Sequence, residues 1–400
     1  MKFLKKLENQ TLIAIIFGLL VGYFFPGAST YHSVLGDLFI TLLKMVMIPL
    51  VLLTLFHSLL NLTKQQDIFK QLGFGIFVYY LATSVLASFN GLLMANIFSF
   101  GGSFETEKVS GLSSLAPKDI VLSFFSKNLF KSLVEGDLVP LIVFTITFAV
   151  FVGKSTKNKD RLIEIVDVLT DAIQKLTEFI IKFTPVGVFS LVAVLFNKLD
   201  FDKYSEMGSF FMATGIGMSI HAFIILPLIL WVTTKFSPLR FFLQVREAVL
   251  VAFFSQSSSA TMPVTMRVLE ENAQVEEKVY GVSVPIGATL NMDGAAFYHA
   301  ILIMFMASLS GIQLGFGEQI VLLLLTQVSS AGAAGIPNGG LMMMSMMLSI
   351  VGIPAEMIAL YIIVDRFWDL PITAVNVWGD LIGAKVLDSK LKNSSDKAHI

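Results

Sequence analysis

The stretch Gly287-Ala-Thr-Leu-Asn-Met-Asp-Gly294 decides the fold class, because it places an amide and a carboxylate between glycines inside an apolar segment. Three further clusters of polar and small residues interrupt apolar sequence in the second half of the chain, at residues 255–261, 329–340 and 365–380. Hydrocarbon cannot hydrogen-bond irregular backbone, so such clusters survive at membrane depth only where protein encloses them or a cavity runs beside them. If the flanking segments cross a membrane, the four clusters mark an enclosed polar site.

The composition indicates that the flanking segments do cross a membrane. Of the 400 residues, 55% are hydrophobic and only 14% are charged, against about a quarter charged in soluble domains. Several apolar runs approach or exceed the roughly 20 residues that span a hydrocarbon core as a helix. They are Thr11–Phe25, Leu35–Leu55, Ile76–Phe98, Leu138–Val152 and Met212–Val232. We expect an all-α polytopic membrane protein, whose lysine-rich N-terminus leads into a first spanning helix rather than a cleaved signal peptide.

Charge and cysteine content exclude other classes. The formal net charge of −1 gives no basic field for nucleic acid, and the absence of cysteine removes disulfides and thiolate-bound metals. No catalytic triad or metal-binding run appears, so we expect no enzyme and no cofactor besides coupling ions. Lysine and arginine gather in short loops near residues 64–70, 154–161 and 385–392. This predicts a multi-pass protein of the plasma or bacterial inner membrane with both termini cytoplasmic.

Two of the polar clusters lie midway along apolar segments, Leu239–Leu269 and Glu318–Val351, that are too short to cross a membrane twice. Each is therefore predicted to be a re-entrant hairpin, which enters and leaves by the same face. The other two clusters follow as interrupted or polar helices, and such a doubled pattern is typical of a transporter's midplane site. Residues 160–183 differ, because their acidic side chains at helical spacing indicate an amphipathic helix.

The last polar cluster forms a single stripe, since Asp369, Thr373, Asn376 and Asp380 are spaced by four, three and four residues. An ionisable residue at the centre of a spanning helix costs roughly 2.5 to 3.5 kcal/mol, so two aspartates on one stripe need cations or polar partners. A structural ion pair between Arg366 and Asp369 is the alternative, although it leaves Asp380 unexplained.

The other clusters also supply ligands. Local unwinding within residues 287–294 would offer carbonyl oxygens beside Asp293, which suits a hard cation, whereas the alternative is a glycine kink with a capped aspartate. Ser257, Ser258 and Ser259 would offer hydroxyls and free amides to a carboxylate at a hairpin tip, although in isolation they resemble a linker. The second tip, residues 332–340, has the small residues of a gate, in which Asn338 either contacts solute or stiffens the tip.

Three of these motifs together resemble the glutamate transporter homologues of the dicarboxylate and amino-acid:cation symporter family. They are Ser-Ser-Ser-Ala-Thr-Met-Pro-Val-Thr-Met-Arg (257–267), the stretch 287–294 and Asn-Val-Trp-Gly-Asp (376–380), and the similarity runs from Leu43 to Asp380. The resemblance implies eight transmembrane helices plus two opposed re-entrant helical hairpins, an elevator-type transporter fold and a homotrimer. It also implies scaffold segments (1–71, 101–200), a transport domain (72–100 and 201–386, with hairpins near 239–272 and 317–351) and a cytoplasmic tail (387–400).

The resemblance further implies binding residues for sodium and for an amino acid. The first sodium position involves Gly287, Asn291, Asn376 and Asp380; the second Thr289 with carbonyls near Ser330, Ala331 and Ala333; the third Tyr80, Thr83, Ser84, Asn291 and Asp293. Asp369 would pair with the α-ammonium group, while Ser258 and Asn376 would bind the α-carboxylate with help from main chain near Gln256 and Ile336. The pocket would also include Ser257, Ser259, Ala295, Gly340, Ile372 and Thr373.

The expected pocket departs from the acidic-substrate pattern of the family. Glutamate and aspartate carriers have an arginine on the last helix where this chain has Ile372, and a threonine where it has Ala295. Neither replacement can pair with a second carboxylate, whose unpaired burial costs several kcal/mol. Gln256 stands where some prokaryotic relatives have a basic residue, and its uncharged side chain also favours a neutral substrate. We therefore expect sodium-coupled symport or exchange of a neutral amino acid.

Alternatives remain at two residues and for the class of protein. Arg366 lies about 60° from Asp369 around the helix, so it could reach the pocket. Sodium- or proton-coupled transport of acidic amino acids or dicarboxylates is therefore an alternative. His299 stands where mammalian glutamate carriers have a proton-accepting glutamate, so it is either a proton site or a neutral histidine hydrogen-bonded within the bundle. An anion channel is the rival of another class, although paired hairpins around a complete set of ligands favour a carrier.

Overall fold

The computed structural model describes residues 7–25, 29–62, 74–100, 125–135, 138–154, 159–198, 204–333 and 339–398. No residue in these ranges belongs to a β-strand, which confirms the all-α prediction. In chain order the helices are α1 (Leu7–Phe24), α2 (Ser29–Leu62), α4 (Phe74–Phe98), α6 (Leu129–Glu135), α7 (Leu138–Lys154), α8 (Lys159–Ile181), α9 (Thr184–Lys198), α10 (Tyr204–Ile220), the π-turn η5 (His221–Ile225), α11 (Leu226–Thr234), α12 (Pro238–Ser255), α13 (Ser258–Glu271), α14 (Glu277–Leu290), α15 (Asp293–Leu309), α16 (Phe316–Ala333), α17 (Gly339–Val351), the 3₁₀ turn η6 (Ala355–Met357) and α18 (Ile358–Ala398).

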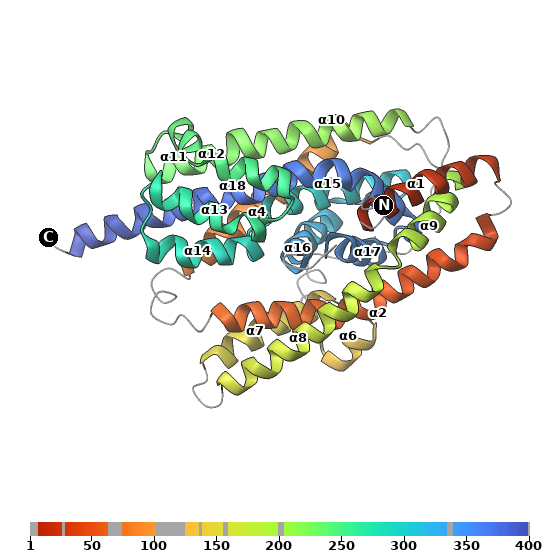
Figure 1. Cartoon of the computed structure of the whole chain (residues 1–400), viewed down its shortest axis with the longest axis horizontal. Coiled ribbons are helices and arrows are strands. Elements are labelled where there is room, and N and C mark those ends of the chain that lie inside the picture. Colours follow the sequence, from red (N-terminus) through yellow and green to blue (C-terminus); the bar gives the residue numbers. More distant parts are fainter. Residues whose placement is uncertain are drawn as a thin grey trace.

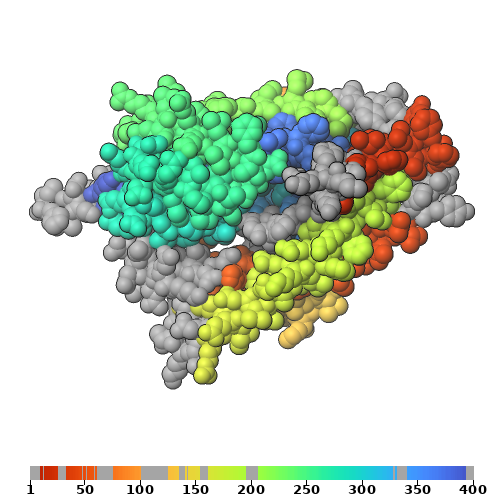
Figure 2. Space-filling model, in the orientation of Figure 1, coloured from red at the N-terminus to blue at the C-terminus, as the bar shows by residue number. Residues whose placement is uncertain are grey.

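The helices form two groups, which Figure 1 shows one above the other. In the lower group α2 packs against α7, α8 and α9, and α9 also packs against α1, which Figure 1 shows higher up, at the level of α15. In the upper group α4 packs against α10, α15, α16 and α18, so this early helix associates with the second half of the chain. In Figure 2 the α8–α9 pair crosses the surface as a diagonal ridge, while residues of α12 to α14 form a separate mass beside it.

Close helix contacts hold the lower group together. A Cβ on Gly187 of α9 would collide with the ring of Phe39, a buried residue of α2. The hydroxyl of buried Ser190 in α9 also accepts the Gly36 N–H of α2, at 3.0 Å. α8 is amphipathic as expected, because buried Ile163 and Val166 lie three residues apart on one face, while most of its other positions, both polar and apolar, are exposed. These contacts join α2, α8 and α9 into one packed unit.

The first hairpin consists of α12 and α13 and ends at a short, well-defined tip. α12 begins with Pro238 in its first turn, where the missing N–H costs nothing, and ends at Gln256, whose φ of 54° is left-handed. Ser257 is extended, and its hydroxyl accepts the Ala260 N–H at 3.1 Å, which caps the start of α13. The two helices span residues 238–271, close to the predicted range 239–272, and their re-entry into the membrane stays a prediction.

The second hairpin consists of α16 and α17, which pack against each other and against α15. Both arms lie within the predicted range 317–351, apart from one residue at the start of α16. Residues 334–338 lie outside the described residues, and so do the predictions for Ile336 and Asn338. Nothing is described of the side chains of Ala331 and Ala333 either, although both residues belong to the last turn of α16.

The chain between α14 and α15 is locally unwound, as the sequence predicted. Asn291 (φ −92°, ψ 82°) and Met292 (φ −111°, ψ 52°) leave the helical region, and Asp293 starts the next helix. The break is narrower than expected, because Gly287 and Gly294 remain helical. Gly294 is needed for packing instead, since a Cβ there would lie 2.5 Å from the Ile372 carbonyl oxygen of α18.

By length and composition, four segments of the described residues can cross a membrane: Ser33–His57, Gly75–Phe98, Glu206–Thr234 and Glu277–Leu309. The bent pair Arg161–Ile181 and Thr184–Val194, with an angle of 52° at its break, would be a fifth. The resemblance implied eight, and the difference has physical reasons. The apolar parts of α1 and α7 are short (Ile13–Phe24 and Val143–Gly153), and α18 carries ionisable side chains. The polytopic class is confirmed, while the number of spans stays a prediction.

Candidate functional site

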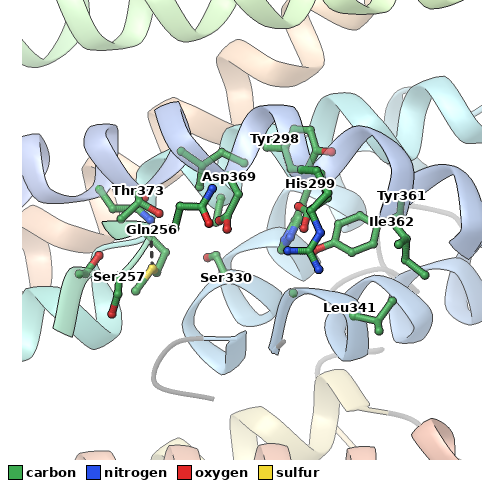
Figure 3. A pocket seen from close by; sticks show the side chains of 18 of the residues that line it. Gln256, Ser257, Tyr298, His299, Ser330, Leu341, Tyr361, Ile362, Asp369 and Thr373 are labelled. Atoms are coloured by element: carbon green, nitrogen blue, oxygen red, sulfur yellow. Dashed lines mark hydrogen bonds between the residues drawn. The ribbon is translucent and has the colours of Figure 1, made fainter. Parts of the chain in front are cut away.

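A cavity of about 450 Å³ lies where the tip of the first hairpin, α15, the start of α17 and α18 meet. Figure 3 shows Gln256, Ser257 and Thr373 at one end, His299, Tyr361 and Ile362 at the other, and Asp369 and Ser330 between them. Thr11 of α1 and Thr184 of α9 also line it, so both helix groups contribute to its wall.

The described residues of the predicted solute pocket all line this cavity. They are Gln256, Ser257, Ser258, Ser259, Ala295, Gly340, Asp369, Ile372, Thr373 and Asn376. Segments more than a hundred residues apart in the chain are therefore brought to one place. Their individual roles stay predictions, but their convergence is what a single binding site requires.

The first turn of α13 presents its N-terminus to the cavity. Ser258 and Ser259 begin the helix, and the first amides of a helix have no partner within it. Of these amides, the Ser257 hydroxyl accepts a hydrogen bond from that of Ala260. A carboxylate can accept the remaining N–H and hydroxyl groups, and the helix dipole favours its negative charge.

α18 forms the longest wall of the cavity, because positions spaced by three and four residues share one face of a helix. Beyond the predicted stripe, this wall also includes Asp365 and Arg366, one turn before Asp369. Asp369 has an interaction partner within the structure, so both interpretations of it, a structural pair with Arg366 and a ligand for the solute, stay predictions. The sequence named residues 365–380 as polar but assigned no role to Asp365.

Asn376 has one side of its amide engaged by the protein. Its Oδ1 accepts the Gly294 N–H at 2.8 Å, while its Nδ2 lies 3.3 Å from the Met292 sulfur. Thioether sulfur is a weak acceptor, so the Nδ2 donor remains available to a stronger one. The orientation agrees with the predicted donation from Asn376 to a carboxylate in the cavity.

A compact cluster of oxygen-bearing side chains is buried beside the cavity. The Thr83 hydroxyl donates to Asn291 Oδ1 at 3.2 Å, and Asn291 Nδ2 donates to Asp380 Oδ1 at 2.9 Å. The Ser84 hydroxyl donates to Asp293 Oδ1 at 2.7 Å. The cluster thus joins α4, the break between α14 and α15, and α18.

The two carboxylates of the cluster are almost completely buried, with Asp293 0% and Asp380 2% exposed. Within the described residues, neither makes an ion pair with lysine or arginine. Buried carboxylates are costly unless they are paired or bind a cation, so a positive charge is expected here. No group of three or more His, Asp or Glu suited to a metal ion occurs in the described part of the chain. Hydroxyl, amide and carboxylate oxygens instead suit a hard cation of low charge.

The remaining predicted sodium residues fall into two places. The Tyr80 hydroxyl donates to the Ser283 carbonyl at 2.7 Å, and a Cβ on Gly287 would collide with Asp380 Oδ1 and the Tyr80 hydroxyl, so both residues adjoin the cluster. Thr289 donates to the Ile286 carbonyl at 2.9 Å, and Ser330 donates to the Gln327 carbonyl at 3.0 Å. No hydrogen bond between Thr289 and Ser330 is found among the described residues. The residues of the first and third predicted positions lie together, and the second position stays a prediction.

Two buried histidines lie near these groups. His299 lines the cavity, and its Nδ1 is 3.1 Å from the Ser329 hydroxyl, which agrees with a hydrogen-bonded histidine within the bundle. A proton-transfer role for His299 stays a prediction. His221 was not singled out by the sequence, yet its Nε2 lies 3.4 Å from Asp293 Oδ2. The available signal was that His221 is the sole ionisable residue of the apolar run Met212–Val232.

Comparison with known proteins agrees with this arrangement. A family model described as the sodium:dicarboxylate symporter family matches residues 7–390. Excitatory amino acid transporter 3 of Mus musculus is 27% identical over 456 residues, covering 98% of this chain and 86% of the relative. The proton/sodium-glutamate symport protein of Bacillus subtilis is 29% identical over 400 residues, covering 95% and 92%. Excitatory amino acid transporter 1 of Ambystoma tigrinum is 28% identical over 449 residues, covering 94% and 82%.

Proposed function

Because the chain belongs to the sodium:dicarboxylate symporter family, and is therefore a sodium-coupled secondary transporter rather than an enzyme, we propose that it carries a neutral amino acid. The observation that carries this proposal is that Ile372 and Ala295 line the same cavity as Asp369. Asp369 offers a negative charge to an ammonium group, while the two apolar residues offer nothing to a second carboxylate. The site therefore suits a zwitterion with an uncharged side chain.

The backbone of an amino acid would be held at both of its charged ends. Asp369 pairs with the α-ammonium group through a charge-assisted hydrogen bond. The α-carboxylate accepts from the first turn of α13, where Ser258 and Ser259 lie, and from the Nδ2 group of Asn376. These groups lie on the first hairpin and α18, so a bound amino acid links the hairpin to the central helix.

The formal charge of the cavity also favours a neutral solute. Its wall contains two aspartates, Asp365 and Asp369, and one arginine, Arg366, which leaves one excess negative charge if His299 is neutral. A zwitterion adds no net charge, whereas an acidic amino acid adds another negative charge to a partly desolvated site. Asp365, the direct neighbour of Arg366 in sequence, offsets the arginine that an acidic side chain would need.

Sodium binding would use the buried cluster. The proposed ligands are Asp380 and Asn376 on α18, Asn291 and Asp293 at the helix break, and Thr83 and Ser84 on α4. A bound cation would offset the charge of the two buried carboxylates. It would also hold α4 and α18 together beside the solute cavity, which is a physical basis for coupling the two ligands.

Movement across the membrane would follow an elevator mechanism. In this proposal α1, α2 and α6 to α9 form a scaffold, and α4 with α10 to α18 carries the ligands. The two groups of helices in Figure 1, and the packing of α4 with the second group, support this division. We also propose a homotrimer on the basis of the family resemblance, in which exposed apolar residues of α8, such as Ile165, Val168 and Phe179, face a partner subunit or lipid. We further propose that both termini are cytoplasmic, on the basis of the lysine-rich loops.

Transport of an acidic amino acid is the second candidate. Its support is that Arg366 lines the cavity and that several similar proteins are named as glutamate or excitatory amino acid transporters. In this alternative, Arg366 would bind the side-chain carboxylate although Asp365 lies beside it. The two candidates share the fold, the sodium coupling and the role of Asp369, and they differ only in the solute side chain.

Competition in proteoliposomes distinguishes the two candidates. Unlabelled alanine, serine, leucine, aspartate and glutamate would each compete against a transported tracer, with sodium present and with choline in its place. We expect sodium-dependent inhibition by neutral amino acids and weak inhibition by aspartate and glutamate. The substitution Ile372→Arg should then introduce inhibition by acidic amino acids. Strong inhibition of the wild type by aspartate alone would replace the neutral assignment with the acidic one.

A further inference from the structure

The membrane-spanning helix from Glu206 to Thr234 contains a π-turn in its middle. The turn covers His221–Ile225, where the Leu226 N–H bonds to the His221 carbonyl, five residues back. Single π-turns inside α-helices are rare and are frequently found at functional sites. Here the irregularity begins at the one ionisable residue of the apolar stretch, His221.

Neighbouring helices contact the backbone just before this turn and within it. Asn90 of α4 donates its amide to the Gly217 carbonyl at 2.7 Å, and Trp378 of α18 donates its indole N–H to the Ala222 carbonyl at 2.9 Å. Gly217 is itself required for close packing, because a Cβ there would lie 2.6 Å from atoms of Met94 and Phe297. The backbone around His221 is therefore positioned by α4 and α18, the helices that also carry the proposed sodium ligands.

Among the described residues, the imidazole of His221 has one hydrogen-bonding partner. Its side chain is completely buried, its Nε2 lies 3.4 Å from Asp293 Oδ2, and its Nδ1 has no hydrogen-bond partner in the described part of the chain. A polar group buried without compensation costs free energy, so packing alone would favour an apolar residue at this position. The contact with Asp293 is thus the one polar interaction that accounts for a histidine here.

Asp293 is held from two opposite directions as a result. Ser84 of α4 donates to Oδ1 at 2.7 Å, and His221 faces Oδ2 from the π-turn. Fixing both oxygens sets the rotation of the carboxylate and leaves the remaining lone pairs directed toward the rest of the cluster. Groups that orient a metal ligand in this way commonly change metal affinity by about 10- to 100-fold when they are removed.

We propose that His221 is a positioning residue for the sodium site: its imidazole donates Nε2–H to Asp293 Oδ2 and orders that carboxylate for cation binding. The inference rests on the proposed role of Asp293 as a sodium ligand. His221 does not touch sodium itself, and it does not contact the amino-acid cavity. It therefore acts on the sodium affinity and leaves intrinsic recognition of the amino acid unchanged.

The test compares the sodium dependence of thermal stability in purified protein for the wild type, His221→Leu and His221→Gln. The leucine variant removes the donor, while the glutamine variant keeps an N–H group at the end of a side chain of similar length. We expect His221→Leu to raise the half-saturating sodium concentration by about tenfold or more, and His221→Gln to restore it to within about threefold of the wild type. Amino-acid affinity at saturating sodium should be the same in all three.

Thr214→Val serves as the matched control, because Thr214 is completely buried on α10 and its hydroxyl has no partner among the described residues. This variant should leave the sodium dependence unchanged. If His221→Leu does not fold, His221→Asn replaces it, since its shorter amide cannot reach Asp293 and should show the same loss relative to His221→Gln.

Three results would overturn the proposal. An unshifted sodium dependence in both donor-deficient variants would remove His221 from the site. Equal loss in the glutamine and leucine variants would show that packing, rather than the hydrogen bond, is what matters. If the thermal stability of the wild type does not depend on sodium, both the proposed sodium site and this inference are wrong. The first two results would contradict only this inference and not the proposed function.

Discussion

The solute cavity and the buried cation cluster lie side by side along α18, yet they differ in how complete they are. In the cluster, hydroxyl, amide and carboxylate groups already bond to one another at 2.7 to 3.2 Å. In the cavity, Asp365, Arg366 and Asp369 are only partly buried and face open space. The cation ligands are thus bonded to one another, whereas the charged groups of the cavity wall border a space that a solute can enter.

Asn376 connects the two regions. Its main-chain oxygen accepts the Asn291 amide of the cluster at 3.3 Å, while its side chain lines the cavity. A cation that draws Asn291 and Asp380 together would therefore also fix the orientation of Asn376 toward the solute. This gives sodium a route to increase amino-acid affinity, and by linkage the amino acid must increase sodium affinity by the same factor.

The largest expected effect is on the cluster side of this comparison, from Asp380→Asn. Removing one buried carboxylate should weaken sodium binding by on the order of 100-fold or more, because the cation loses a desolvated counter-charge. The same change should raise the melting temperature in sodium-free buffer, since the variant no longer buries that unpaired carboxylate. Sodium titrations of thermal stability measure both effects.

Asp388→Asn is the matched control for that variant. Asp388 is a second buried aspartate of α18, but it accepts the Glu276 N–H and pairs with Lys392 instead of joining the cluster. Its substitution should lower stability and leave the half-saturating sodium concentration unchanged. A similar loss of sodium response in both variants would show that general damage to α18 is responsible.

The next effect belongs to the cavity, where Asp369→Asn should lower amino-acid affinity by about 10- to 100-fold through loss of a charge-assisted hydrogen bond. Because Asp369 lies outside the cluster, stabilisation by sodium alone should persist. Isothermal titration with the preferred amino acid at saturating sodium measures the loss. Unchanged affinity would remove Asp369 from the ammonium role, and a lost sodium response would show that the two regions are not separable.

A smaller effect on the cluster side is expected from Thr83→Val, which removes the hydroxyl that donates to Asn291 Oδ1. One neutral hydrogen bond contributes about 1 kcal/mol, so sodium affinity should fall by roughly fivefold. Ser88→Ala is the control, because Ser88 lies on the same helix but interacts with Thr326 and Gln327 of α16. Equal shifts in the two variants would argue that α4 packing, and not the Asn291 contact, controls the site.

The spacing of polar and apolar residues along the sequence predicted much of this architecture. The spacing of the polar residues on α18 correctly placed Asp369, Thr373 and Asn376 on one face, because helix periodicity is a property of neighbouring residues. The polar cluster midway along the apolar segment Leu239–Leu269 similarly placed the first hairpin tip near Ser257. These predictions needed no knowledge of which segments meet.

The rest depended on contacts between distant segments. His221 and Asp293 are 72 residues apart, and nothing in the spacing of either segment reveals that the π-turn faces the helix break. Arg366 was weighed as a partner of Asp369 because the two lie one turn apart, but which group pairs with either residue depends on side-chain packing that periodicity does not describe. Pairings across the fold are set by tertiary packing, so single-sequence reasoning names the residues more readily than their partners.

The smallest expected effect concerns the tip of the first hairpin, which borders the solute cavity and not the cation cluster. Ser257→Ala removes the cap that accepts the Ala260 N–H, and such caps contribute about 1 kcal/mol to helix stability. We expect faster hydrogen exchange at the first amides of α13 and no change in sodium affinity, because the tip borders the cavity and not the cluster. Ser237→Ala is the control: Ser237 precedes α12 in the same position, but its side chain makes no capping bond. Equal exchange in both variants would mean that the tip is ordered by its packing against the rest of the protein rather than by its cap.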